Sequence, residues 1–187
     1  MKTYNLFLVA LFAITLLSCS DDDDGGSDII NEEEVITTLN LSLTPTGGTA
    51  IVFSSRDLDA DGPDQPVITV SDLAANTTYE GVIEVLNETE SPAEDITEEV
   101  ATEDDEHQFF FQTVGNVSIT TEYSDMDDDD NPIGINFTLT TGDASTGNLV
   151  ITLRHLLDKF ADGVSDGEIT NAGGDTDIEV DFPITIQ

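Results

Sequence analysis

The stretch that decides the fold is Asp177–Ile186 near the C-terminus, which reads DIEVDFPITI. Its apolar residues fall on every second position, at Ile178, Val180, Phe182, Ile184 and Ile186. This period of two is typical of a β-strand with one face buried and the other exposed. A half-buried strand needs hydrogen-bonded neighbours, so the rest of the chain must supply further strands.

The same alternation recurs upstream. It is clear at 35–44, 117–123, 135–140 and 149–154, and weaker at 50–55, 66–70, 79–86 and 108–114. Turn-forming clusters separate these short segments, which predicts an all-β fold, an antiparallel β-sandwich. One short helix is expected near 92–103, with Ser91 as N-cap and Pro92 as the first helical residue.

Residues 73–79, with the sequence LAANTTY, lead into the alternating residues Gly81, Ile83 and Val85. This segment resembles the tyrosine corner of fibronectin type III and immunoglobulin-like sandwiches, although Ala75 stands where those domains often have proline. The resemblance implies an Ig/fibronectin III-like sandwich in which the Tyr79 hydroxyl bonds backbone a few residues upstream. The alternative is an ordinary junction between a loop and a strand.

The N-terminus has the pattern of a lipoprotein signal peptide. Lys2 precedes the apolar run Leu6–Leu17, which is shorter than the roughly 20 residues of a membrane span. Leu16–Cys19 resembles a bacterial lipobox, which implies removal of residues 1–18 and lipidation of Cys19, and two or more acyl chains would anchor the protein stably in a membrane. The alternative is ordinary secretion with Cys19 left free.

Residues 19–33 form an acidic, Gly/Ser-containing stretch that predicts a flexible tether, followed by the sandwich domain at 34–187. The run Asp21–Asp24 directly after Cys19 resembles the surface-export signal of Bacteroidota lipoproteins. It implies an outer-membrane lipoprotein on the cell-surface side. A plain spacer on a protein that faces the periplasm is the alternative.

The domain itself resembles a group of Bacteroidota (flavobacterial-type) lipoproteins without an established activity. The resemblance lies in the runs at 94–99, 105–110, 153–155 and 168–174. Relatives often carry a generic type 1 periplasmic-binding label, which would imply two doubly wound α/β lobes. One helix and many alternating strands do not fit that fold.

The charge excludes some partners and suggests a metal. With 40 Asp and Glu against 4 Lys and Arg, the net charge is -36, so binding to nucleic acid through phosphates is excluded. Two loops place carboxylates on alternate positions, as calcium loops do, although neither has the glutamate that ends an EF-hand. The predicted Ca²⁺ ligands are Asp57, Asp59, Asp61 and Asp64 in one loop, and Asp125, Asp127, Asp129 and Asn131 in the other. The alternative is that both loops are solvated acidic surface.

The two histidines define a second candidate metal site, made of Glu106, His107 and His155. If strands 108–114 and 149–155 are neighbours, both imidazoles can meet carboxylates and bind Zn²⁺ or Cu²⁺. Their spacing matches no zinc motif, so the favoured alternative is a satisfied histidine at the rim beside an exposed acidic turn.

No nucleophile elbow, metalloprotease motif or phosphate-binding glycine loop is present in the sequence. We therefore expect a non-enzymatic binding or structural module with calcium-braced loops. The second hypothesis is a lipoprotein that captures a cation or small ligand for an outer-membrane, TonB-dependent receptor.

Overall fold

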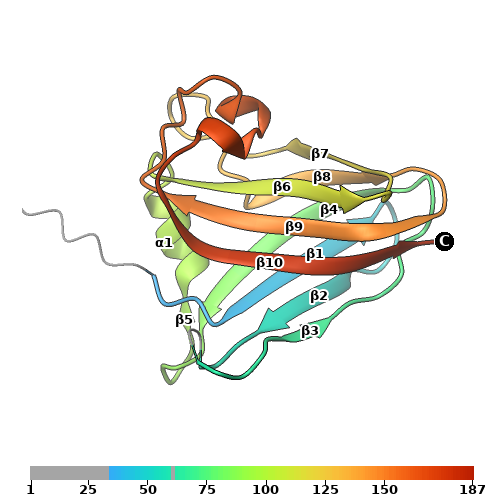
Figure 1. Cartoon of the computed structure of the whole chain (residues 1–187), viewed down its shortest axis with the longest axis horizontal. Coiled ribbons are helices and arrows are strands. Elements are labelled where there is room, and N and C mark those ends of the chain that lie inside the picture. The colour runs from blue at the N-terminus through green and yellow to red at the C-terminus, as the bar shows by residue number, and fades with distance from the viewer. Residues whose placement is uncertain (1–33, 60–61) are drawn as a thin grey trace, which may run out of the picture. The chain divides into compact units, whose positions relative to one another are not determined.

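The computed structural model describes residues 34–59 and 62–187, which form two antiparallel sheets packed face to face (Figure 1). The larger sheet has the order β3-β2-β1-β4-β8-β7, with β5 added beside β4, and the smaller sheet has the order β10-β9-β6. The strands of the larger sheet are β1 (Thr38–Pro45), β2 (Ile51–Arg56), β3 (Val67–Thr69), β4 (Thr78–Asn87), β5 (Glu94–Asp95), β7 (Ile119–Tyr123) and β8 (Asn136–Thr141). Those of the smaller sheet are β6 (His107–Gly115), β9 (Ser145–His155) and β10 (Asp175–Ile186).

Every strand predicted from alternation is present, and the alternating apolar residues form the core between the sheets. β10, for example, buries Val180, Phe182, Ile184 and Ile186 on one face. They pack with residues of the larger sheet, among them Leu39, Leu41, Leu43, Phe53, Ile83, Val85, Phe137 and Leu139. Burial of this continuous apolar layer is the main force that holds the two sheets together.

The corner before β4 has the predicted hydrogen bond. The backbone N–H of Ala74 donates to the Tyr79 hydroxyl at 2.8 Å, and the Tyr79 side chain is almost fully buried. Leu73 also bridges to Ile186 of the other sheet, so this corner fixes the crossing between the two layers.

The helix is shorter than the sequence suggested. α1 spans Ile96–Thr102, and its N-cap is Asp95, whose carboxylate accepts a hydrogen bond from the Thr97 N–H at 3.0 Å. The prediction of Ser91 as N-cap is wrong, because residues 94–95 pair with β4 in extended conformation before the helix begins. Ile96 and Val100 pack α1 onto the core.

A second, smaller core lies on the outer face of the three-stranded sheet. The segment between β9 and β10 contains the 3-10 helices η1 (Val164–Asp166) and η2 (Ile169–Asn171) and folds over that face. Phe110 points outward from β6 and is fully buried there against Leu157, Val164 and Ala172. β6 is therefore buried on both faces here, with Phe109 in the main core and Phe110 in the smaller one.

Candidate metal centre

The two histidines lie side by side at one end of the smaller sheet. β6 and β9 are antiparallel neighbours in a register that places His107 directly opposite His155. Directly paired residues share a face of the sheet, and here the rings stack with centroids 4.4 Å apart and planes 14° apart. Both side chains are buried, with 0% of His107 and 6% of His155 exposed. The strand pairing that the sequence hypothesis required is therefore present.

An irregularity in β10 brings Asp177 to the same place. The pairing of β10 with β9 shifts register between Thr176 and Ile178, so Asp177 is an extra residue in the strand. Simple alternation places Asp177 on the outer face, but a β-bulge can turn a side chain to the other side. Its fully buried carboxylate lies 3.8 Å from His107 Nε2 and 3.9 Å from His155 Nδ1.

Glu34 approaches from the segment before β1. Its Oε1 lies 3.4 Å from His107 Nε2, and its Oε2 lies 3.5 Å from His155 Nδ1. Only 4% of the Glu34 side chain is exposed. The position is fixed by the residues that follow, because Ile36 is buried and the Thr37 N–H donates to Leu86 O at 2.9 Å.

Glu103, at the end of α1, completes the group. One ligand atom each from Glu34, Glu103, His107 and His155 lies within 4.8 Å of the others. Within residues 34–59 and 62–187, this is the one group of three or more such side chains that meets that spacing. We name these four residues together with Asp177 the histidine–carboxylate cluster.

Each imidazole has a polar partner on its outer side. His107 Nδ1 lies 3.0 Å from the Glu103 carbonyl oxygen, so a proton on Nδ1 donates to that carbonyl and leaves a lone pair on Nε2. His155 Nε2 lies 3.6 Å from a Glu106 carboxylate oxygen, which leaves Nδ1 facing the cluster. Histidines that bind metals usually direct their outer N–H at a carbonyl or carboxylate, as His107 does; the contact between His155 and Glu106 is longer than a hydrogen bond.

The spacings inside the cluster can be compared with those of a metal site. Charge-assisted N–H···O bonds measure about 2.7–2.9 Å, shorter than the 3.4–3.9 Å found here. Ligand atoms around a tetrahedral ion with bonds of about 2.0–2.2 Å are roughly 3.3–3.6 Å apart. His107 Nε2, His155 Nδ1 and Glu34 Oε2 are buried and have no hydrogen-bond partner. The distances from Glu34 to the two histidines fall within this range, whereas those from Asp177 are longer.

The lysine and arginine side chains in the described part of the chain all have partners outside the cluster. Arg56 pairs with Glu88, Arg154 donates to Thr176, and Lys159 pairs with Asp127. Among the described residues, no lysine or arginine forms an ion pair with Glu34. Buried carboxylates are costly unless a positive charge compensates them, and a bound divalent cation would provide that charge.

The first predicted calcium loop is only partly described, because Asp61 lies outside the described residues. Asp59 Oδ2 accepts a hydrogen bond from the Asp64 N–H at 3.2 Å, so this carboxylate shapes its own turn. Asp57 lies where the chain leaves β2 and lines a pocket. Calcium binding at this loop stays a prediction.

The second predicted calcium loop uses its carboxylates internally. Asp125 accepts hydrogen bonds from the backbone of Gly134 and Asn136 at 2.8 and 2.7 Å. Asp127 is buried, accepts the Asn131 N–H at 2.8 Å and lies 3.1 Å from Lys159 Nζ. Burial acts to raise the pKa of Asp127, but the hydrogen bonds from Asn131 and Lys159 hold it below its usual value. An ammonium group thus already contacts one predicted ligand, and calcium binding here also stays a prediction.

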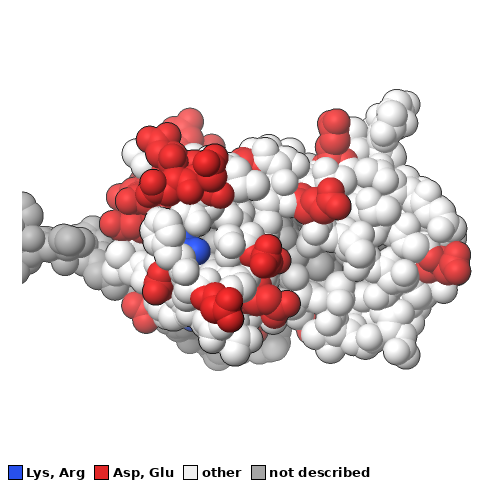
Figure 2. All heavy atoms as spheres, turned by 90° about the horizontal axis from the view of Figure 1, so that it is seen from above, with Lys and Arg blue, Asp and Glu red and all other residues white. Residues whose placement is uncertain are grey.

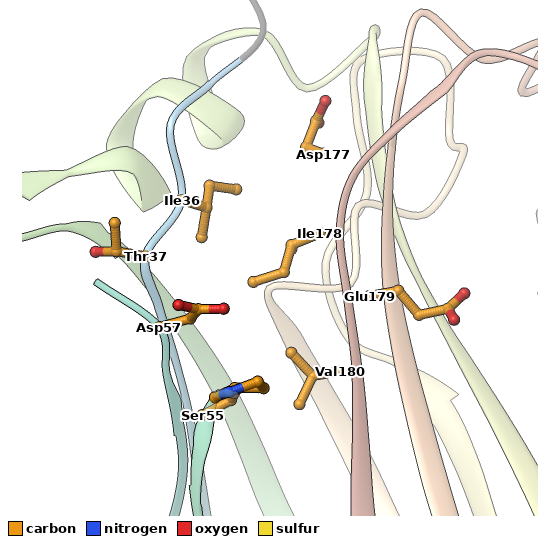
Figure 3. Close-up of a pocket in the computed structure, with 9 residues that line it drawn as sticks. Ile36, Thr37, Ser55, Asp57, Asp177, Ile178, Glu179 and Val180 are labelled. Carbon is orange, nitrogen blue, oxygen red and sulfur yellow. The ribbon is translucent and has the colours of Figure 1, made fainter. Parts of the chain in front are cut away.

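A pocket of about 260 Å³ opens between β1, β2 and β10, beside the cluster. In Figure 3, Ile36 and Ile178 point toward one another across it, and Asp177 lies beyond them. Asp177 therefore lines the pocket and also lies beside the histidines, with its carboxylate fully buried.

Of the ligands predicted from the sequence, His107 and His155 lie in the cluster and Glu106 lies beside it. Glu34, Glu103 and Asp177 were not among the predicted ligands. Glu34 stands at the predicted domain boundary without any motif, and the bulge that turns Asp177 inward leaves no mark in the alternation. Cys19 and the predicted signal peptide lie outside the described residues. No helix in the described part of the chain is long and apolar enough to cross a membrane.

Comparison of the chain with protein-family models, curated proteins and solved structures gives no match. The geometry of the cluster therefore carries the functional argument.

Proposed function

We propose that this protein is a non-enzymatic β-sandwich that captures a divalent transition-metal cation in the histidine–carboxylate cluster. One observation carries the proposal: two buried imidazole nitrogens without hydrogen-bond partners converge with Glu34 at spacings of 3.4 and 3.5 Å. Asp177 and Glu103 offer further oxygen ligands around the same point.

The donor set indicates the class of metal. Imidazole nitrogen combined with carboxylate oxygen suits Zn²⁺ and Cu²⁺, whereas Ca²⁺ and Mg²⁺ prefer sites made of oxygen alone. The spacing fits the tetrahedral geometry that Zn²⁺ prefers. Zn²⁺ is therefore the proposed ligand, with Cu²⁺ as the nearest competitor.

The setting of the site is part of the proposal. Lipidation at Cys19 would hold the domain at the outer membrane, on the cell-surface side, where it could pass a captured cation to an outer-membrane receptor. Two features support an Ig/fibronectin III-like sandwich as the scaffold: the hydrogen bond between Ala74 and Tyr79, and the packing of two antiparallel sheets.

Isothermal titration of the purified protein with Zn²⁺ tests the proposed function. We expect one sub-micromolar site, and we expect His107→Ala and His155→Ala each to remove it, because each takes away a nitrogen ligand. Glu106→Ala should weaken binding by about 10-fold, since it removes the carboxylate beside His155 Nε2 and loss of an outer partner costs roughly 10–100-fold in affinity.

Asp105→Asn is the matched control, because it changes an exposed carboxylate of the same turn. It should bind Zn²⁺ as the unsubstituted protein does. Binding of Zn²⁺ that survives both histidine substitutions would contradict the proposed site, and so would a preference for Ca²⁺ over Zn²⁺ at these residues.

A further inference from the structure

An acidic surface lies directly beside the cluster on β5 and α1. It is a shallow concave area lined by Glu94, Asp95, Glu98, Glu99 and Glu103, with Thr102 among them, and we name these five acids the acidic ridge. Acidic side chains also gather toward this end of the molecule when it is seen from above, at the end where α1 and the histidine-bearing ends of β6 and β9 lie (Figures 1 and 2).

The acidic ridge and the cluster are physically continuous. Glu103 lines the ridge and also places a carboxylate oxygen within 4.8 Å of the ligand atoms of Glu34, His107 and His155. The negative charges of the ridge and of the cluster also repel one another. Partial burial raises the pKa of Glu99, and the negative charges of Glu34 and Glu103 raise it further. A cation on the ridge would relieve this repulsion.

The ridge alone would be a solvated acidic face, as expected in so acidic a chain. The independent observation lies at its inner end, where His107 Nε2, His155 Nδ1 and Glu34 Oε2 are buried without hydrogen-bond partners. In the proposed metal site these atoms are the ligands, and Glu103 joins them to the surface. The acidic ridge therefore lies at the surface, and the proposed ligand atoms lie buried at its inner end.

We propose that the acidic ridge is the approach surface of the metal site: it concentrates divalent cations from solution and passes them through Glu103 to the histidines. This inference rests on the proposed function of the cluster. Surfaces of one sign around a binding point raise association rates by about 10–1,000-fold, and the effect falls steeply with ionic strength. The ridge should thus speed association without holding the bound ion.

Stopped-flow mixing of the full chain with Zn²⁺ and a fluorescent zinc indicator separates the two rates. The ridge variant is Glu94→Gln with Glu98→Gln and Glu99→Gln, which removes three charges and leaves Glu103 and the N-cap Asp95 in place. We expect its association rate at low salt to fall about 10-fold or more, with an unchanged dissociation rate. In high salt the ridge variant and the unsubstituted protein should associate at similar rates.

The control removes three charges from the opposite end of the sandwich, through Asp72→Asn, Glu80→Gln and Asp143→Asn. It should associate as fast as the unsubstituted protein. If the ridge variant matches this control, or loses affinity only through faster dissociation, the approach surface is refuted while the metal site stands. If the unsubstituted protein itself binds no Zn²⁺, the proposed function fails, and this inference fails with it.

Discussion

Lys159→Met is expected to lower the free energy of unfolding by about 3–5 kcal/mol, because it leaves a buried carboxylate without its partner. Lys159 Nζ donates to Asp127 Oδ2 at 3.1 Å, to Pro132 O at 3.0 Å and to Asp104 O. Each side chain of the Lys159–Asp127 pair is only 2% exposed. Methionine replaces the apolar part of the side chain, is one atom shorter, and removes the charge and the donors. Guanidinium denaturation measures the loss.

The double variant Lys159→Met with Asp127→Asn is the control, since it removes both charges. It should recover part of the lost stability if the cost comes from the unpaired carboxylate. The pKa of Asp127 is lowered in the fold, so its contribution to stability is complete above about pH 4 and is lost as pH falls through the folded pKa. The deficit of Lys159→Met should therefore shrink in acid. Equal denaturation midpoints for Lys159→Met and the unsubstituted protein at pH 7 would contradict this account.

Zn²⁺ is expected to raise the melting temperature of the protein, which is the second large effect. A ligand that binds only the folded state, present at a hundredfold excess over its Kd, adds about 2.7 kcal/mol of stability. For a domain of this size that is a rise in melting temperature of roughly 5–10 °C. The rise should diminish in acid, because protons compete with the metal for imidazole nitrogen. Thermal melts followed by circular dichroism measure it.

The specificity of this rise separates the cluster from the acidic loops. His107→Ala and His155→Ala should remove it, whereas Asp128→Asn with Asp129→Asn, in an exposed part of the second loop, should keep it. Ca²⁺ tests the loops in the same experiment. A larger rise with Ca²⁺ than with Zn²⁺, unaffected by the histidine substitutions, would favour calcium-braced loops over a metal site at the histidines.

The strands and the core could be predicted from the sequence because alternation records burial directly. In Asp177–Ile186 the apolar residues from Val180 onward face the core as their spacing indicates. The hydrogen bond between Ala74 and Tyr79 was also predictable, since it depends on residues close in sequence. The start of α1 was not, because pairing of residues 94–95 with β4 delays the helix beyond its apparent cap.

The histidine–carboxylate cluster was only partly predictable from the sequence. The parity of His155 with Leu149, Ile151 and Leu153 indicated that it faces inward, and the structure places it there. The pairing of His155 with His107 joins two residues 48 positions apart in the chain, and no local pattern in the sequence records that register. Glu34 is brought to the histidines by the path of the segment before β1, and Asp177 by the bulge in β10. Both are tertiary features.

The contact between Lys159 and Asp127 is another tertiary feature that could not be predicted from the sequence. A carboxylate pattern with calcium-like spacing carries no sign that an ammonium group from a distant loop will bond to it. The chain has only 4 Lys and Arg, and one of them is buried against Asp127, so its tertiary position changes how the second loop is interpreted.

A crystal structure of the Zn²⁺-loaded protein, with the metal located by anomalous scattering, tests the central claim most directly. The account predicts one zinc ion bonded to His107 Nε2 and His155 Nδ1, with a carboxylate oxygen of Glu34 about 2.0–2.2 Å from the metal. Zinc bound only at the acidic loops, with both imidazoles uncoordinated, would contradict it.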